Sequence, residues 1–273
     1  MCVRVVTVMQ ARSSSTRLPG KVLRPVLGIP VLLQQARRME RAGLLGTLVV
    51  ATSTDPADDE LVDIVEADGI PVVRGSLDDL LDRHLVAGRE FDADAVVKIP
   101  SDCPLIDPAI IDLVLGSFLE SGADFTSNLH PPSWPDGHDV EIVRMEVLEE
   151  AGREATKDFE REHTTPFVWE RPDRYRVENL TWDRGEDFSM SHRWTIDYPE
   201  DLAFVTAVYE AFGDADDPSP TFGLDDVLDL LDARPDVAAI NARYAGVNWY
   251  RHHLDDLATV HSDATRFAPE ERA

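Results

Sequence analysis

The hydrophobic and polar positions in the N-terminal part of the chain form a strand pattern that alternates with a helix pattern. Short apolar, β-branched runs predict four buried strands, at 5–9, 47–52, 70–73 and 93–99. Apolar residues at helical spacing, or helix-start residues, follow each run and predict helices at 29–42, 55–68, 77–89 and beyond residue 108. This alternation favours right-handed crossovers and a mainly parallel sheet, and so an α/β fold.

Ligands of such a sheet bind beyond the carboxyl ends of its strands. We therefore expect the loops that follow the four strands to face one cleft. These loops lie at 10–21, 52–55, 74–76 and 100–107.

The pattern changes near residue 123 and predicts a mixed α and β portion. The expected strands lie at 123–127, 138–143, 174–180 and 192–196, and the expected helices at 144–153 and 158–170. We interpret 123–195 as an insert or lid on the open side of the sheet.

The C-terminal part begins with a predicted helix over 199–212. An acidic, proline-containing linker follows at 213–220, then two short helices at 224–234 and 236–243, and a polar tail. We therefore predict one domain at 1–213, which includes the insert, and a helical extension at 214–273. Trp249 and Tyr250 are expected to anchor the tail to the body or to a second subunit, in a homodimer. His252 and His253 are expected to form a surface pair.

The first predicted strand ends in a loop, Gln10 to Lys21, whose residues are small, polar and cationic. Arg12, Arg17 and Lys21 accompany a run of serines, and Pro19-Gly20 ends the run. Serine hydroxyls, backbone N–H groups and cations that converge after a strand form a concave anion site. The Gly-x-x-x-x-Gly-Lys-Ser/Thr and Gly-x-Gly-x-x-Gly patterns are absent, so this phosphate loop belongs to neither a P-loop ATPase nor a classical dinucleotide domain.

The charge of the chain restricts its partners. The 52 acidic residues outnumber the 26 basic ones, which gives a formal net charge of −26. Such a chain repels nucleic acid and anionic membranes, so both are disfavoured as partners. An anionic substrate therefore needs a local exception. Two of the three lysines of the chain, Lys21 and Lys98, lie at ends of the predicted strands.

The cysteines and the hydropathy pattern predict a soluble, cytoplasmic protein. Cys2 and Cys103 have no metal-like spacing, which favours a reducing compartment over a disulfide scaffold. The sequence has no basic region followed by an apolar one at its start, and no apolar run approaches 18 residues.

Several motifs together resemble the cytidylyltransferases that make CMP-sugars, the CMP-Kdo and CMP-sialic acid synthetase group. The first is the loop Gln10–Lys21. The others, at 53–55, 101–107, 135–141, 161–166 and 195–202, resemble the spore-coat polysaccharide branch of that group. The resemblance covers about Val3 to Phe212. It implies a nucleotide-diphospho-sugar transferase type of fold, and attack of an acceptor oxygen on the α-phosphorus of CTP.

The resemblance also implies roles for individual residues. The first loop binds the triphosphate in this family, so Arg12, Ser15, Arg17 and Lys21 inherit nucleotide binding, and Lys21, Arg17 and Asp102 a catalytic role. Asp102 and Asp197 stand where the family holds magnesium. Arg74 falls where family members approach the base.

The sequence departs from the family at two positions. Ser101 replaces a common glycine before the metal aspartate. Thr195 replaces the second aspartate of the sialic-acid enzymes, which favours a Kdo-like metal arrangement.

The same residues also have structural interpretations. Asp102 and Asp197 both precede proline-containing helix starts and could be N-caps. Lys21 could be a solvated turn lysine, and Ser15 a turn former.

Acceptor binding is assigned to residues in the 135–141 and 161–166 motifs. Asp136, Asp139 and Glu141 could bind acceptor hydroxyls or an amine, or else form a solvated turn and strand edge. His163 could bind the acceptor or transfer a proton, or be a hydrogen-bonded structural residue.

We therefore predict a Mg²⁺-dependent cytidylyltransferase that transfers CMP from CTP to a sugar, sugar acid or related small acceptor, for glycan or secondary-metabolite synthesis. A hard cation with carboxylate and phosphate ligands suits this chemistry. One alternative is a metal-dependent glycosyltransferase, although Asp102-Cys103-Pro104 lacks the Asp-x-Asp pattern which that class needs. Another is a non-catalytic nucleotide-binding subunit.

Overall fold

A single seven-stranded mixed sheet organises the computed structural model, which describes residues 3–272. The strand order is β5-β4-β1-β6-β8-β7-β9. The four strands expected from the N-terminal pattern are parallel: β1 (Val5–Gln10), β4 (Thr47–Ser53), β5 (Val72–Gly75) and β6 (Ala95–Pro100). A separate two-stranded hairpin pairs β2 (Pro25–Val26) with β3 (Ile29–Pro30).

Three strands from the middle of the chain extend the same sheet. They are β8 (Glu141–Arg144), antiparallel to β6, then β7 (Phe125–Ser127) and β9 (Val177–Asn179). The segment that we interpreted as an insert on the open side thus supplies nearly half of the central sheet. The apolar side chains of this segment alternate between the two faces of the sheet. They therefore join the same two hydrophobic cores, one on each face, as those of the N-terminal strands.

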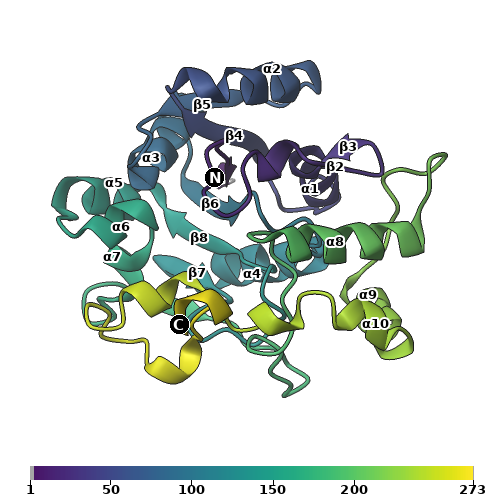
Figure 1. The fold of residues 1–273 in the computed structure, drawn as a ribbon. Helices are drawn as coiled ribbons and strands as arrows, with labels where there is room; N and C mark the ends of the chain where they lie inside the picture. Colours follow the sequence, from purple (N-terminus) through teal and green to yellow (C-terminus); the bar gives the residue numbers. More distant parts are fainter. Residues whose placement is uncertain (1–2, 273) are drawn as a thin grey trace.

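Helices cover both faces of the sheet, in three layers (Figure 1). Side chains alternate along each strand, so Met9 and Val97 face one core while Val8 and Val96 face the other. The first core is covered by α1 (Val31–Met39), α2 (Asp59–Ala67), α4 (Pro108–Ser121) and α8 (Pro199–Phe212). The second is covered by α3 (Leu80–Glu90), α5 (Met145–Glu154), α6 (Asp158–Glu162) and α7 (Pro166–Trp169).

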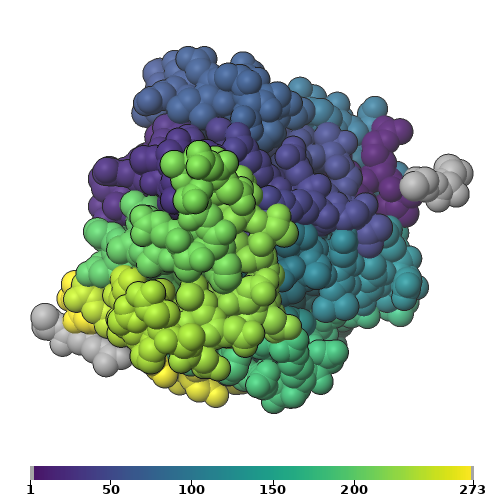
Figure 2. Space-filling model, turned by 90° about the vertical axis from the view of Figure 1, so that its right-hand side faces the viewer, coloured from purple at the N-terminus to yellow at the C-terminus, as the bar shows by residue number. Residues whose placement is uncertain are grey.

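The C-terminal segments pack against the rest of the molecule (Figure 2). Phe222, ahead of α9 (Leu224–Ala233), and Val237 of α10 (Pro235–Ala238) belong to the same core as α8. Short 3₁₀ helices follow, η3 (Ala242–Tyr244), η4 (Trp249–His252), η5 (Ser262–Ala264) and η6 (Pro269–Arg272). Tyr250 is buried in the second core, as expected for an anchor of the tail. The division at residue 213 stays a prediction.

Two expected elements differ in the structure. The strand expected at 192–196 is wrong, because Arg193 forms only an isolated bridge with Asp136. The helix expected at 158–170 is two short helices, α6 and α7. The break lies at Thr164, whose φ of 71° is left-handed, and Pro166 then starts α7 without an N–H to donate.

The structure also describes one of the two cysteines and the apolar character of the helices. Cys103 is a buried free thiol, whereas Cys2 lies outside the described residues. Among residues 3–272, no helix is both long enough and apolar enough to cross a bilayer.

Candidate active site

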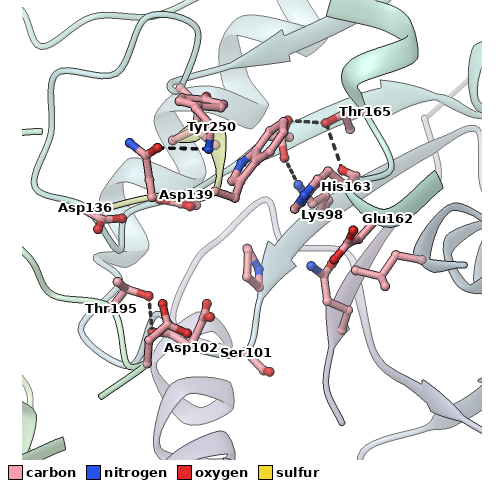
Figure 3. A pocket seen from close by; sticks show the side chains of 18 of the residues that line it. Lys98, Ser101, Asp102, Asp136, Asp139, Glu162, His163, Thr165, Thr195 and Tyr250 are labelled. Carbon is pink, nitrogen blue, oxygen red and sulfur yellow. Dashed lines mark hydrogen bonds and ion pairs between the residues drawn. The ribbon is translucent and has the colours of Figure 1, made fainter. Parts of the chain in front are cut away.

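A cleft of about 1280 Å³ opens at the carboxyl ends of β1 and β6. Gln10 and Pro100, the last residues of these strands, line it, as do the phosphate loop and the start of α3. The other walls come from the segments around residues 128–141, 161–165, 189–197 and 247–253. Figure 3 shows Asp102, Asp136, Asp139, Lys98 and Tyr250 around this cleft.

Hydrogen bonds to Asp58 hold the phosphate loop in place. The Ser13 N–H donates to Asp58 Oδ1 at 2.7 Å, and the Thr52 hydroxyl donates to Asp58 Oδ2 at 2.9 Å. Burial opposes ionisation of Asp58, but these bonds, with those from Ser53, lower its pKa. The loop is therefore anchored on the end of β4.

Of the four loops expected at the cleft, those after β1 and β6 line it, whereas residues 52–55 and 74–76 do not. Residues 78–80, which come just after, do line it. Thr52, near the end of β4, instead donates to Asp58, which anchors the phosphate loop. This expectation was therefore correct for two loops and wrong for two.

Lys21 joins the two aspartates that we expected to hold a metal. Its Nζ lies 2.9 Å from Asp102 Oδ2 and 2.9 Å from Asp197 Oδ1, and it donates to the Ile196 carbonyl at 2.6 Å. Burial disfavours the ammonium, yet the charges of Asp102 and Asp197 raise the pKa of Lys21 above its usual range. Lys21 is thus not a solvated turn lysine.

A buried arginine fixes the position of Asp197. The Arg193 side chain is 1% exposed and donates to Asp197 Oδ2 at 2.9 Å and to Asp201 at 3.0 Å. Asp201 also accepts the N–H groups of Asp197 and Tyr198, both at 2.9 Å. Asp201, not Asp197, therefore caps α8. Burial opposes ionisation of Asp197, but Lys21, Arg193 and Arg17 lower its pKa.

Carboxylates outnumber cations around this centre. Asp136 and Asp139 lie near Asp102, and burial together with the neighbouring carboxylates raises their pKa values, that of Asp139 to about 6. Mg²⁺ is usually bound through one or two carboxylates together with substrate phosphates and water, and Asp102 and Asp197 offer such a pair. The residues present therefore fit a divalent cation held by Asp102 and Asp197.

The phosphate-loop residues take different places. The Arg17 guanidinium lies 2.7 Å from Asp197 Oδ1, whereas Arg12 is exposed and makes no ion pair within the described chain. The Ser15 hydroxyl accepts the Leu18 N–H at 3.4 Å. Arg12, Ser15 and Arg17 all line the cleft.

Arg74 does not reach the cleft. Its guanidinium donates to the Ser53 carbonyl at 2.8 Å and to the Asp55 carbonyl at 2.9 Å, and pairs with Asp59 at 2.7 Å. Because these local partners occupy the guanidinium, the geometry does not support the expected role at the base.

The expected acceptor residues line the cleft, but Glu141 is not open to a ligand. Its carboxylate is 2% exposed, pairs with Lys98, accepts the Thr165 hydroxyl at 2.6 Å and lies 3.3 Å from His130 Nε2. Burial opposes ionisation of Glu141, but Lys98 and His130 lower its pKa. Asp136 pairs with Arg193 at 3.3 Å. Asp139 has no ion-pair partner in the described part of the chain.

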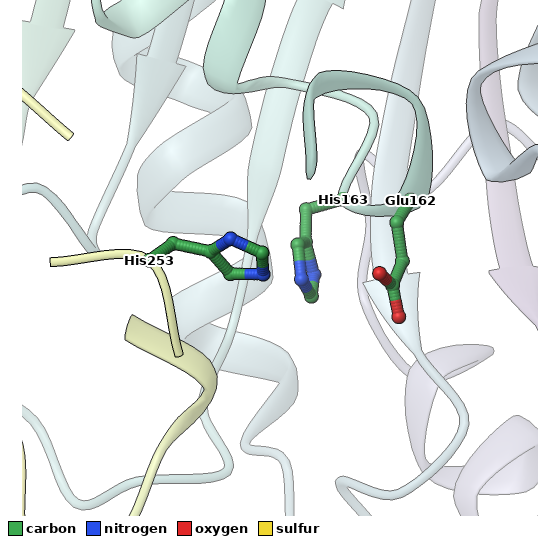
Figure 4. A group of neighbouring side chains, drawn as sticks. All are labelled: Glu162, His163 and His253. Carbon is green, nitrogen blue, oxygen red and sulfur yellow. The ribbon is translucent and has the colours of Figure 1, made fainter. Parts of the chain in front are cut away.

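His163 lies at the end of α6 and stacks on Trp249, with ring centroids 3.7 Å apart. Burial lowers the pKa of His163 to about 3, so the ring is neutral. The two residues expected as a surface pair also line the cleft, and the His253 ring centroid is 6.0 Å from that of His163 (Figure 4). The surface assignment was therefore wrong for His253, because the tail folds back over the cleft.

Arg83 is a cleft residue that the sequence analysis missed. It is 1% exposed, its Nε has no hydrogen-bond partner in the structure, and the carbonyl of Leu77 accepts from its terminal nitrogen at 3.4 Å. Burial, and then the charge of Arg12, lower the pKa of Arg83 to about 10. The only local signal was an arginine between the apolar positions Leu81 and Leu85 of the predicted helix.

Comparison with known proteins agrees with this geometry. The cytidylyltransferase family model matches residues 6–215. The chain belongs to the cytidylyltransferase family. Within it, the chain is 31% identical over 240 residues to the spore coat polysaccharide biosynthesis protein SpsF of Bacillus subtilis, an alignment that spans 86% of this chain and 96% of that protein.

Solved structures show the same fold. A cytidylyltransferase from Leptospira borgpetersenii has a TM-score of 0.80 at 29% identity and covers 87% of this chain and 97% of its own. A CMP-2-keto-3-deoxy-manno-octonic acid synthetase in complex with CTP has a TM-score of 0.58 at 18% identity, over 76% of this chain and 99% of its own. The Mycobacterium tuberculosis protein Rv0371c, in complex with manganese, has a TM-score of 0.53 at 16% identity, over 76% of this chain and 99% of its own. The Leptospira protein thus shares the fold described above, and the last two structures show a likeness of fold alone.

Proposed function

We propose that this cytidylyltransferase transfers CMP from CTP to a small acceptor, in the synthesis of a glycan or secondary metabolite. The observation that carries the proposal is the convergence of Asp102 and Asp197 on Lys21, directly beside the cationic phosphate loop. The spore-coat relative and the CTP complex of a structural neighbour support the choice of reaction.

In the proposed reaction, an acceptor oxygen attacks the α-phosphorus of CTP. A new O–P bond forms, the bond from the α-phosphorus to the oxygen that bridges to the β-phosphorus breaks, and pyrophosphate leaves. The acceptor hydroxyl releases its proton to solvent. Negative charge grows on the phosphoryl oxygens and on pyrophosphate, so the protein acts by positioning and by charge stabilisation.

Different residues of the cleft would bind the triphosphate and hold the divalent cation. Arg12 and Arg83 have no carboxylate partner within 4.0 Å among the described residues, so their charge is free to bind a triphosphate. Lys21 and Arg17 bring two more cations to the same part of the cleft. Asp102 and Asp197 would hold Mg²⁺, which when bound supplies charge neutralisation to the phosphate oxygens. The manganese complex of a structural neighbour supports a divalent cation.

The proposal is tested in two steps. We expect CTP with Mg²⁺ to raise the melting temperature more than ATP, GTP or UTP do, because ligand binding to the native state stabilises it. We then expect pyrophosphate release from CTP when a sugar acceptor is added. Asp102→Asn should abolish release, whereas the exposed Asp173→Asn should not.

Two results would count against the proposal. Equal stabilisation by all four triphosphates would remove the preference for CTP. Stabilisation by CTP without pyrophosphate release, across a broad set of acceptors, would indicate a non-catalytic nucleotide-binding subunit.

A further inference from the structure

Three side chains of the types that bind metal ions meet at one wall of the cleft. They are Glu162 at the end of α6, His163 directly after it, and His253 directly after η4, and all three line the cleft. One nitrogen or oxygen atom from each lies within 4.8 Å of those of the other two. Figure 4 shows the two imidazole rings and the carboxylate side by side, with His163 in the middle. We call these three residues the His–His–Glu cluster.

The side chains of the cluster have no polar partners. Within residues 3–272, the Glu162 carboxylate and the ring nitrogens of both histidines make no hydrogen bond or ion pair. Glu162 is exposed and both rings are half-buried. Burial lowers the pKa of His163 to about 3, and the neutral ring keeps a nitrogen lone pair that can bind a metal ion. The cluster therefore presents donor atoms that are available to a ligand.

Aromatic contacts hold the two rings in place. His163 stacks on Trp249, with ring centroids 3.7 Å apart and ring planes at 19°. The His253 ring centroid lies 5.4 Å from that of Phe159 and 5.9 Å from that of Trp249. Because Trp249 contacts both imidazoles, their relative position is set before any ligand binds.

The tail that carries His253 is also anchored. The His253 N–H donates to the Tyr250 carbonyl at 2.9 Å, and Tyr250 is buried in the second core. Farther along, the Thr259 N–H donates to the Glu170 carboxylate at 3.0 Å, at the end of α7. The tail is thus fastened on both sides of His253, which keeps this ring against α6.

The chemistry of the donors favours a divalent transition metal over Mg²⁺. Imidazole nitrogens suit Zn²⁺ and Ni²⁺, whereas carboxylate oxygens and water suit Mg²⁺. Zn²⁺ held by three protein ligands keeps a fourth position for water or substrate. Two ligand atoms that each lie about 2.1 Å from one ion are at most about 4.2 Å apart. A small movement of the exposed Glu162 side chain would therefore close the site around an ion.

We infer that the His–His–Glu cluster binds one divalent transition-metal ion, such as Zn²⁺. This site is separate from the Asp102 and Asp197 pair, and Figure 3 shows Glu162 and His163 well apart from Asp102. The inference goes beyond the proposed function, because the cluster needs no nucleotide to bind its ion.

Zinc titration of the untagged, full-length protein tests the inference. Isothermal titration calorimetry in excess Mg²⁺, which occupies the oxygen sites, should give one Zn²⁺ per chain. Glu162→Gln and His253→Gln should each weaken Zn²⁺ binding at least about 10-fold, since even residues that only support a metal ligand contribute that much. Glu162→Gln removes no hydrogen bond or ion pair within residues 3–272, so its melting temperature without metal should match that of the wild type.

Two control variants locate the ion. His252→Gln removes the exposed neighbouring imidazole, which is not part of the cluster, and should leave Zn²⁺ binding unchanged. Asp102→Asn removes a ligand of the proposed Mg²⁺ site and should leave Zn²⁺ binding unchanged as well.

The inference is overturned if the wild type binds no Zn²⁺ in excess Mg²⁺, or if Glu162→Gln and His253→Gln bind it as tightly as the wild type does. It is also overturned if His252→Gln weakens binding as much as His253→Gln, which would indicate chelation by adjacent histidines, or if Asp102→Asn abolishes binding. No nucleotide is present in these titrations. Their failure therefore leaves the proposed function intact, and that function is tested separately by pyrophosphate release from CTP.

Discussion

Asp102 and Asp197 accept hydrogen bonds from the same ammonium group, the Nζ of Lys21, at 2.9 Å each. Asp102 follows β6 and Asp197 precedes α8, so distant parts of the chain meet at this point. Without the ammonium, two partly buried carboxylates would face each other. Lys21 therefore offsets part of this negative charge in the absence of a divalent cation, together with Arg17 and Arg193 at Asp197.

Replacing Lys21 by methionine tests this relationship. We expect kcat to fall about 10²- to 10³-fold, as when a charge-stabilising donor is lost from an active site. The variant should also be stabilised by Mg²⁺ alone more than the wild type is, because Asp102 has lost its one ion-pair partner among the described residues. Thermal denaturation across a Mg²⁺ titration measures this effect.

The control for this variant is Lys157→Met, which removes an exposed lysine outside the cleft. It should leave both kcat and the Mg²⁺ effect unchanged. A Lys21→Met enzyme with wild-type turnover would show that Lys21 is not part of the catalytic machinery.

Arg83→Met should separate stability from nucleotide binding. The guanidinium is buried with an unsatisfied Nε, so its loss should leave the free energy of unfolding unchanged or raise it. The KM for CTP should rise at least about 10-fold, since one of two uncommitted cations is gone. Urea denaturation and initial-rate kinetics provide the two measurements.

Arg38→Met is the matched control, because Arg38 is equally buried but donates from two of its nitrogens to backbone carbonyls, and only its Nη1 has no partner in the structure. It donates to the Ile106 and Phe222 carbonyls, both at 3.0 Å. Its loss should lower the free energy of unfolding and leave the KM for CTP unchanged. If the two variants behave alike, Arg83 has only a structural role.

The buried Lys98–Glu141 pair predicts a large coupling energy. Lys98→Met leaves the Glu141 carboxylate buried beside His130 and Thr165, and should lower the free energy of unfolding by roughly 3–5 kcal/mol. The double variant Lys98→Met/Glu141→Gln should recover much of this loss. A double-mutant cycle by urea denaturation measures the coupling, and additive losses would contradict it.

Buried neutral histidines predict that stability falls in mild acid. Burial lowers the pKa of His84 to about 3 and that of His138 to about 4, against 6.5 in the unfolded chain. Below pH 6.5 these histidines therefore take up protons in the unfolded chain but not in the folded protein, and their contribution to the free energy of unfolding decreases as pH falls toward 4. By pH 5, each histidine should contribute a loss of roughly 1–2 kcal/mol.

Urea denaturation at pH 7 and pH 5 checks this expectation. His84→Gln should reduce the difference between the two pH values by about the share of one histidine, whatever its effect at pH 7. If the difference is unchanged, the pKa of His84 is not lower in the folded protein than in the unfolded chain.

The sequence predicted the features that depend on local pattern. The four parallel strands follow from apolar runs of strand length, and the phosphate loop from cations and small residues directly after β1. The motif around Asp102 was expected at the cleft because it follows the carboxyl end of a parallel strand, and Asp102 does line the cleft. By contrast, the expected helix at 158–170 did not take into account Pro166, a local signal for the break that the structure shows at Thr164.

Only the tertiary structure decided which side chains share an environment. It joined the middle strands to the central sheet and brought His253 to His163. It also bound the Arg74 guanidinium to the end of β4, while the Nε of Arg83 has no hydrogen-bond partner in the structure. The charge on an arginine or aspartate is fixed by its residue type. Whether that charge is neutralised or left free for a ligand depends on partners far along the chain, and those are set by packing.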